Sequence, residues 1–212
     1  MKKYFLALTA LFATLNSSGA TDMRTLFKEM PDSILPLLTQ SNRLDMLDFV
    51  ESRMKAVVRN RLDGESELVS ISDCSLQLKY TTLTDIAIRL YYYRDMVPLI
   101  CVVHSVGDGL RDSRISFFDS HWNPVDESRL ISKPVFEDFI AKGLPKDTLS
   151  MLGEVSEVRG ISIVPVEGGL EFIYSGNEYL SRENEKLKKY IIETPLIYSW
   201  NGRRFVLSKK AR

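Results

Sequence analysis

A block of alternating residues between Ser75 and Ser120 constrains the fold of this chain most strongly. Apolar and polar side chains alternate from Leu76 to Thr81 and again from Ile86 to Tyr93. This two-residue period predicts strands with one face in a core and one face toward water. The run from Val97 to Val106 is apolar on both faces and predicts a central strand, and a fourth strand is expected from Arg114 to Asp119. Short turns between the four segments indicate an antiparallel meander.

Helices are expected before this block. Met23, Leu26, Phe27 and Met30 have helical spacing, and Asp22 is placed to cap that helix. A second helix is expected to begin at Ser41 and to use one apolar face, made of Leu44, Leu47, Met54 and Val58.

The second half repeats the order of helix and then strands. Pro134 and Gly143 mark the expected start and end of a helix. Strands follow in four segments, at 160–166, 170–175, 191–200 and 203–208. Asn201-Gly202 predicts a tight hairpin turn between the last two, with both central residues at positive φ.

The predicted fold class is therefore α+β, with N-terminal helices packed on an antiparallel β-meander and a second helix-then-strands segment that ends in a β-hairpin. We expect residues 21–212 to form a single α+β domain. The alternative is a pair of sub-domains, 21–130 and 131–212, that share one core.

The first twenty residues have the order of a signal peptide. Lys2 and Lys3 precede an apolar run from Tyr4 to Leu15, and small residues follow as far as Ala20. The run is too short to span a bilayer, so we expect cleavage after Ala20 and a periplasmic or secreted protein. The other interpretation is a buried N-terminal helix. No cysteine lies directly after the run, which argues against a lipoprotein. No later stretch is long and apolar enough to be transmembrane.

Charge and cysteine content narrow the possible partners. The chain has 28 basic and 28 acidic residues, and removal of the leader takes away two lysines and leaves a net charge of −2. This balance argues against nucleic acid and against anionic lipid surfaces as partners. Cys74 and Cys101 are the only cysteines. Export would allow them to pair, but strands that are not neighbours in a meander favour two separate thiols.

Several segments together resemble a known family. They are MetProAspSerIle at 30–34, AsnArgLeuAspMetLeuAsp at 42–48, AspSerArgIleSerPhePheAsp at 112–119, Trp122-Asn123-Pro124 and TrpAsnGlyArgArgPhe at 200–205. In these the chain resembles a secreted family of Bacteroidales bacteria that is described only as a domain of unknown function. The resemblance covers about residues 23–208. It implies export to the periplasm or beyond and carries over no activity, cofactor or site.

His104 and His121 are the only histidines, and they are the weak catalytic candidates together with Asp112 and Asp119. Asp108 lies nearby in the sequence. The histidines lack the HxxxH and HExxH spacings of metal sites, and the aspartates lack the regular spacing of a calcium loop. We therefore expect no metal, no cofactor and no assembled catalytic set. The simpler interpretation is a strand histidine near a turn, with aspartates that serve the turns. Ser113 has no GxSxG elbow around it and is expected to be structural.

The run Tyr91-Tyr92-Tyr93 is the best candidate for a binding surface. If Tyr92 continues the core row, then Arg89, Tyr91 and Tyr93 face outward next to Arg94, and such a group suits a protein or glycan contact. The alternative is that another element also covers this face.

Two main functions follow from these observations. The first is a non-enzymatic periplasmic binding or interaction protein, with an envelope protein or a glycan as the possible partner. The second is a small periplasmic hydrolase that uses His104 or His121 with a nearby aspartate. A third hypothesis is a structural subunit of an envelope complex.

Overall fold

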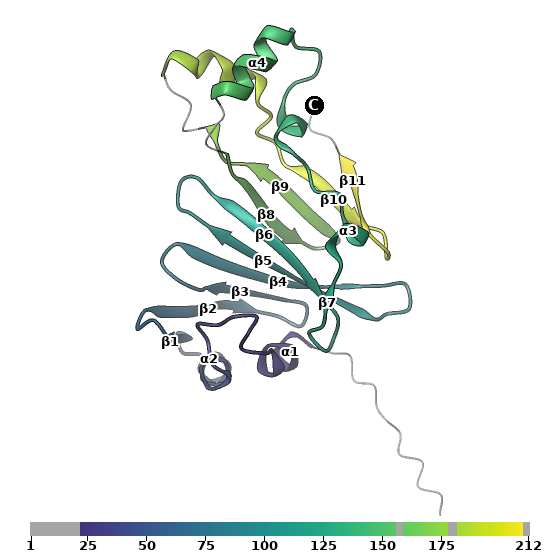
Figure 1. The fold of residues 1–212 in the computed structure, drawn as a ribbon. Coiled ribbons are helices and arrows are strands. Elements are labelled where there is room, and N and C mark those ends of the chain that lie inside the picture. Colours follow the sequence, from purple (N-terminus) through teal and green to yellow (C-terminus); the bar gives the residue numbers. More distant parts are fainter. Residues whose placement is uncertain (1–21, 156–158, 178–181, 210–212) are drawn as a thin grey trace, which may run out of the picture.

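The computed structural model describes residues 22–155, 159–177 and 182–209, and these residues form three layers (Figure 1). The first layer is a pair of helices, α1 (Met23–Glu29) and α2 (Gln40–Glu51). The middle layer is a seven-stranded antiparallel sheet, and the third is a four-stranded antiparallel sheet. The expected α+β class with N-terminal helices ahead of the strands is confirmed.

The large sheet follows the chain order from β1 to β7, as expected for a meander. Its strands are β1 (Val57–Arg59), β2 (Glu65–Ile71), β3 (Ser75–Lys79), β4 (Thr84–Tyr92), β5 (Pro98–Val106), β6 (Asp112–Phe118) and β7 (Pro124–Val125). The sequence block between Ser75 and Ser120 supplies the central strands, and β4 and β5 pair in unbroken register from Thr84↔Val106 to Tyr92↔Pro98.

The second half begins with short helical segments and ends in the small sheet. The helical segments are α3 (Glu127–Leu130), the 3₁₀ helix η1 (Phe136–Phe139), α4 (Lys146–Val155) and the 3₁₀ helix η3 (Arg182–Tyr190). The small sheet has the order β11-β10-β9-β8, with β8 (Ile161–Val166), β9 (Gly169–Tyr174), β10 (Leu196–Trp200) and β11 (Phe205–Lys209). In the described part of the chain, no helix is both long and apolar enough to cross a membrane.

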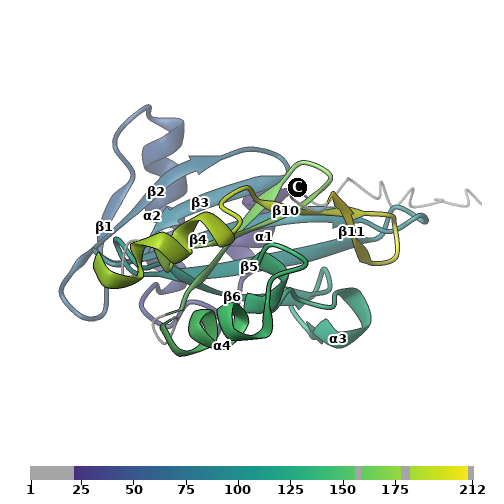
Figure 2. The same cartoon turned by 90° about the horizontal axis from the view of Figure 1, so that it is seen from above.

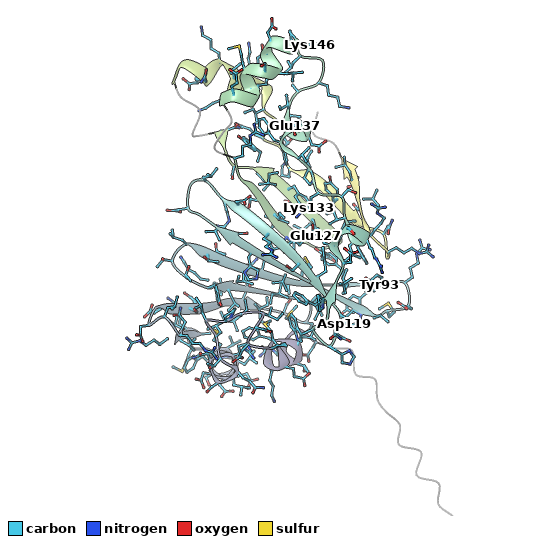
Figure 3. All side chains as sticks on the ribbon, in the orientation of Figure 1. Tyr93, Asp119, Glu127, Lys133, Glu137 and Lys146 are labelled. Carbon is cyan, nitrogen blue, oxygen red and sulfur yellow. The ribbon has the colours of Figure 1, made fainter. Side chains whose placement is uncertain are left out.

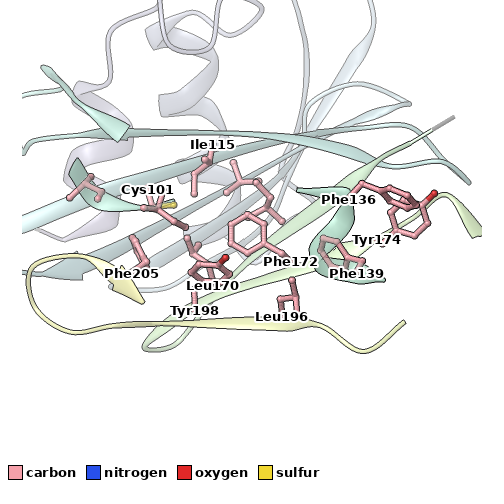
Figure 4. Close-up of a cluster of buried hydrophobic side chains, with 14 of the residues drawn as sticks. Cys101, Ile115, Phe136, Phe139, Leu170, Phe172, Tyr174, Leu196, Tyr198 and Phe205 are labelled. Carbon is pink, nitrogen blue, oxygen red and sulfur yellow. The ribbon is translucent and has the colours of Figure 1, made fainter. Parts of the chain in front are cut away.

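Two apolar cores lie on the two faces of the large sheet. On the helix side, Leu76, Leu78, Ile86 and Ile88 pack against α1 and α2. On the other side, Leu99, Cys101, Val103, Ile115 and Phe117 pack against the small sheet (Figure 4). Seen from above, β1 and β2 lie to one side of the small sheet (Figure 2).

The second layer of strands corrects the expectation that one face of the meander meets water. Most residues on that face of β5 and β6 are themselves apolar, as are Ala87 and Tyr91 of β4, so burying them under the small sheet is favourable. The two cysteines also lie apart. Cys101 belongs to the core beneath the small sheet, Cys74 lies just before β3, and both thiols are free, as expected.

Helix ends differ from the sequence-based expectation at two places. Asp22 caps α1 as expected, and its carboxylate accepts the N–H of Thr25 at 2.7 Å. Helix α2 ends earlier than predicted because Arg53 adopts a left-handed φ of 58°, which stops the helix. Met54 is therefore 61% exposed, and Val58 lies in β1. The helix expected between Pro134 and Gly143 is reduced to the single turn of η1.

The final hairpin is confirmed, but its turn is longer than predicted. Trp200 pairs with Phe205, so four residues lie between the strands, and Gly202 has positive φ whereas Asn201 does not. The side chain of Asn201 explains the wider turn, since its Oδ1 accepts the N–H groups of Arg203 and Arg204 at 3.0 and 2.9 Å.

The free edge of β8 is occupied by side chains from β6. The N–H of Ile161 donates to Asp112 Oδ1 at 3.0 Å, and the N–H of Ile163 donates to Ser113 Oγ at 3.0 Å. The next residue of the same orientation is Pro165, which has no N–H. These bonds join the two sheets and satisfy the outward donors of β8.

Candidate functional site

The tyrosines proposed as a binding surface form part of the joint between the sheets. Tyr91 is only 3% exposed, and its hydroxyl donates to the carbonyls of Val166 and Gly169 at 3.2 and 2.5 Å. Burial raises the pKa of Tyr91. Tyr93 lies edge-on to Trp200 with ring centroids 5.4 Å apart. The expected exposure of Tyr91 is therefore wrong, because the small sheet covers it.

The other residues of the predicted binding surface do not form one exposed group, because the final hairpin packs next to them. Trp200 Nε1 donates to the carbonyl of Tyr92 at 2.7 Å, which brings the final hairpin against the turn between β4 and β5. Arg89 is half-buried and Arg94 is exposed beside Gly202. Two segments that the sequence marked separately, the tyrosine run and the last hairpin, thus meet as one structural contact.

Asp119 lies just after β6 (Figure 3), and His121 follows it in the turn that leads to β7. The Asp119 carboxylate accepts the backbone N–H groups of His121 and Asn123 and the side-chain amide of Asn123, all within 2.9 Å. Slight burial acts to raise the pKa of Asp119, but these hydrogen bonds outweigh it and lower the pKa overall. Asp119 therefore organises a turn.

A catalytic pair of imidazole and carboxylate is not assembled in the part of the chain that the structure describes. The His121 ring is exposed, its Nδ1 lies 3.3 Å from Ser120 Oγ, and it forms no ion pair with a described carboxylate. His104 forms no hydrogen bond or ion pair with any described aspartate, and Asp112 and Asp119 lie at opposite ends of β6. Among the same residues, no group of three or more His, Cys, Asp or Glu side chains is arranged to hold a metal ion.

His104 instead faces a cavity of about 470 Å³ on the helix side of the large sheet. His104 and Val106 come from β5. Arg114 lies opposite His104 on β6, and Ser116 and Phe118 share the same face of that strand. Ser33 and Ile34, in the loop after α1, form the wall. A volume of this size suits a small ligand, and apolar walls with a few polar groups are typical of such sites.

Some polar side chains of the cavity already form hydrogen bonds with other described residues, and others do not. Ser113 Oγ accepts the N–H of Ile163 at 3.0 Å, and Asp112 Oδ1 accepts the N–H of Ile161 at 3.0 Å, so both serve the contact between the sheets. Arg114 is exposed and forms no ion pair with a described carboxylate, Asp112 included. The guanidinium therefore keeps its donors for another acceptor.

Arg114 also affects its cross-strand partner His104. Burial, and secondly the charge of Arg114, lower the pKa of His104 below its usual value. The imidazole is therefore neutral at pH 7, with one nitrogen able to donate and the other able to accept. The cavity thus presents a cation, a neutral imidazole and the Ser116 hydroxyl, together with the Asp112 carboxylate that is hydrogen-bonded to Ile161.

The sequence marked His104, Asp112 and Ser113, and the structure brings all three to this cavity. From the sequence, we did not identify Arg114, Ser116 or the wall residues Ser33 and Ile34 as candidate site residues. Register is the signal that could have identified Arg114, because a short turn between β5 and β6 sets His104 opposite Arg114.

Comparisons with known proteins give a family and a fold but no activity. A family model described as "Protein of unknown function (DUF3256)" matches residues 15–205. The chain is also similar to a solved structure described as "Structure of a domain of an uncharacterized protein from Porphyromonas gingivalis W83". That similarity has a TM-score of 0.77 at 22% identity and covers 88% of this chain and 98% of the other. No curated protein matches.

Proposed function

The chain belongs to the DUF3256 family of proteins of unknown function, as its resemblance predicted, and we propose that it is an exported protein that binds a small anionic ligand without transforming it. The ligand carries a carboxylate or phosphate group and occupies the cavity between β5, β6 and the loop after α1. The single observation that carries this proposal is Arg114, a guanidinium at the cavity that forms no ion pair with any described carboxylate and lies next to a neutral histidine.

Guanidinium groups bind carboxylates and phosphates through two parallel hydrogen bonds. Arg114 is therefore better suited to bind an anionic ligand than a neutral one. His104 and Ser116 supply further donors on the same face. Ile34, Val106 and Phe118 are apolar and favour a ligand with a small apolar part.

Binding is preferred over hydrolysis because the described residues place no carboxylate on either imidazole ring. A general base needs a partner that orients it and a path for the proton, and Asp112 is engaged by the backbone of β8. Burial, and secondly the charge of Arg114, also lower the pKa of the His104 imidazole, which makes it a weak base.

Export is part of the proposal and is supported by the order of charge, apolar run and small residues in positions 1–20. These positions lie outside the described residues. Protein recovered from the cell envelope or the medium is expected to begin at Thr21, and its intact mass checks this. An intact mass that includes the first twenty residues would contradict export by cleavage.

The binding proposal is tested by titration calorimetry with succinate and with inorganic phosphate as probes. Arg114→Gln is expected to weaken binding about 10- to 100-fold, as the loss of charge-assisted hydrogen bonds does. Arg203→Gln is the matched control, because Arg203 is exposed in the final hairpin turn, away from the cavity.

Binding should also tighten as the pH falls, since a bound anion favours the imidazolium form of His104. His104→Asn is expected to remove this pH dependence. Equal affinity in wild type and Arg114→Gln, or no measurable binding of either probe, would contradict the proposal.

A further inference from the structure

A second and larger hollow, of about 910 Å³, lies beyond the ends of β8 and β9. It is formed where the segment after η1 meets the segment after η3, in the region that Figure 1 shows beside α4. Ile140 and Ile191 form an isolated antiparallel bridge, the N–H of Ala141 donates to the carbonyl of Tyr190 at 2.8 Å, and the N–H of Ile192 donates to Phe139 at 2.7 Å. Two short extended segments thus make a fixed floor, which we name the bridge groove.

The floor of the bridge groove is aliphatic, and its rim is cationic. Ile140, Ala141 and Ile192 line the floor, and Lys142, Lys188 and Lys189 line the rim. None of the three lysines forms an ion pair with a carboxylate of the described residues.

Glu193 is the acidic residue of the lining, and its carboxylate accepts a hydrogen bond from the Asn177 side chain at 2.9 Å. Its bonding partner is thus an amide and not an ammonium group. The Lys189 ammonium lies over the ring of Tyr190, 4.8 Å from its centroid. Among the described residues of the lining, three lysines and one glutamate therefore leave an excess of positive charge around an aliphatic floor.

We propose that the bridge groove binds a monoacyl carboxylate, that is, a fatty-acid-like anion whose chain lies on the aliphatic floor. Its carboxylate is held by Lys142, Lys188 and Lys189. Charge complementarity selects the head group, and the aliphatic floor in a hollow of about 910 Å³ selects a chain over a small polar anion. This site is separate from the His104 cavity, and it stands or falls independently of the function proposed above.

An acyl chain makes a quantitative test possible. Each methylene buried in the groove is expected to tighten binding about fourfold, which corresponds to about 0.8 kcal/mol. The dissociation constants of hexanoate, octanoate and decanoate should therefore fall in even steps. Decanol should bind more weakly than decanoate, because it lacks the charge that the lysines match.

The experiment is a titration of these probes, below their micelle concentrations, against the full chain and two variants. Lys142→Gln combined with Lys188→Gln and Lys189→Gln is expected to weaken decanoate binding at least tenfold and to leave succinate binding at the His104 cavity unchanged. Lys186→Gln is the control, since Lys186 is exposed on the same 3₁₀ helix and does not line the groove. Circular dichroism establishes that each variant is folded.

Three results would overturn the proposal. One is no binding of decanoate to folded wild-type protein, and another is an affinity that does not depend on chain length or on the lysines. The third is a dimer in sedimentation velocity that the triple variant abolishes and that decanoate does not disturb. That last result would assign the groove to a second copy of the chain.

Discussion

At the scale of single residues, His104 links the acid sensitivity of the fold to the proposed ligand cavity. Burial, and then Arg114, lower the pKa of His104 in the folded chain, whereas an unfolded histidine titrates near 6.5. Between these two values the unfolded chain binds more protons than the folded chain. The free energy of unfolding should therefore fall as the pH is lowered below about 6.5, and His104 contributes nothing to the pH dependence above that range.

Urea denaturation between pH 7.5 and 5 measures this effect. His104→Asn should flatten the dependence, and His121→Asn should leave it unchanged, because His121 is exposed. An unaltered slope in His104→Asn would refute the assignment.

Arg43 shows which residues sequence reasoning does not find. It is 1% exposed inside the core beneath α1 and α2, although a charged residue in a helix is expected at the surface. Its guanidinium donates to the carbonyls of Phe27 and Leu38 at 3.0 and 2.9 Å, to that of Met30, and to Asp32 at 2.9 Å. The partners are three backbone carbonyls and the Asp32 carboxylate, from α1 and the segment between α1 and α2, and no periodicity in the sequence reveals them.

At the scale of elements, the close approach of β9 and β10 depends on Gly169. A Cβ on this residue would overlap the carbonyl oxygen of Tyr198, and the carbonyl of Gly169 itself accepts the Tyr91 hydroxyl. Gly169→Ala should lower the free energy of unfolding by about 1–3 kcal/mol or more, as overpacking does.

Gly153→Ala is the matched control, because nothing lies within 4 Å of a Cβ there and Gly153 is helical in α4. It should leave stability unchanged or raise it by up to about 1 kcal/mol. Thermal unfolding of both variants compares them, and equal melting temperatures would contradict the close approach.

Elements with a long run of regular alternation were predictable from the sequence, and elements set by tertiary contacts were not. The alternation in β3 and β4 predicted the meander because a two-residue period has one structural explanation. The helix predicted between Pro134 and Gly143 is only the single turn of η1. Its spacing of apolar residues reflects burial of Phe136 and Phe139 in the core shared with the small sheet, and not a long helix face. The cover over Tyr91 comes from residues more than seventy positions away, which local patterns do not specify.

At the scale of the whole molecule, we propose that residues 22–209 fold as one unit, because the large sheet belongs to both cores. A chain cut to residues 22–130 keeps the helix-side core and uncovers Leu99, Cys101, Val103, Ile115 and Phe117, each at most 2% exposed in the full chain. It should associate and expose the Cys101 thiol, whose pKa burial raises in the intact fold.

Thiol titration and sedimentation measure this outcome. The folded full chain should react faster at half-buried Cys74 than at Cys101, and the shortened chain should react quickly at both. A shortened chain that stays monomeric, unfolds cooperatively and protects Cys101 would instead support two sub-domains.

The edge of β8, where backbone N–H groups are already hydrogen-bonded, affects how the protein behaves at high concentration. Strand-by-strand polymerisation needs a row of vacant amide donors, and along 161–165 two are already bound by Asp112 and Ser113 while proline supplies none. Fibrillar growth from this border is therefore blocked until the two sheets separate. Replacing Asp112 or Ser113 would free one backbone N–H group at this edge of β8 without changing a residue of the strand.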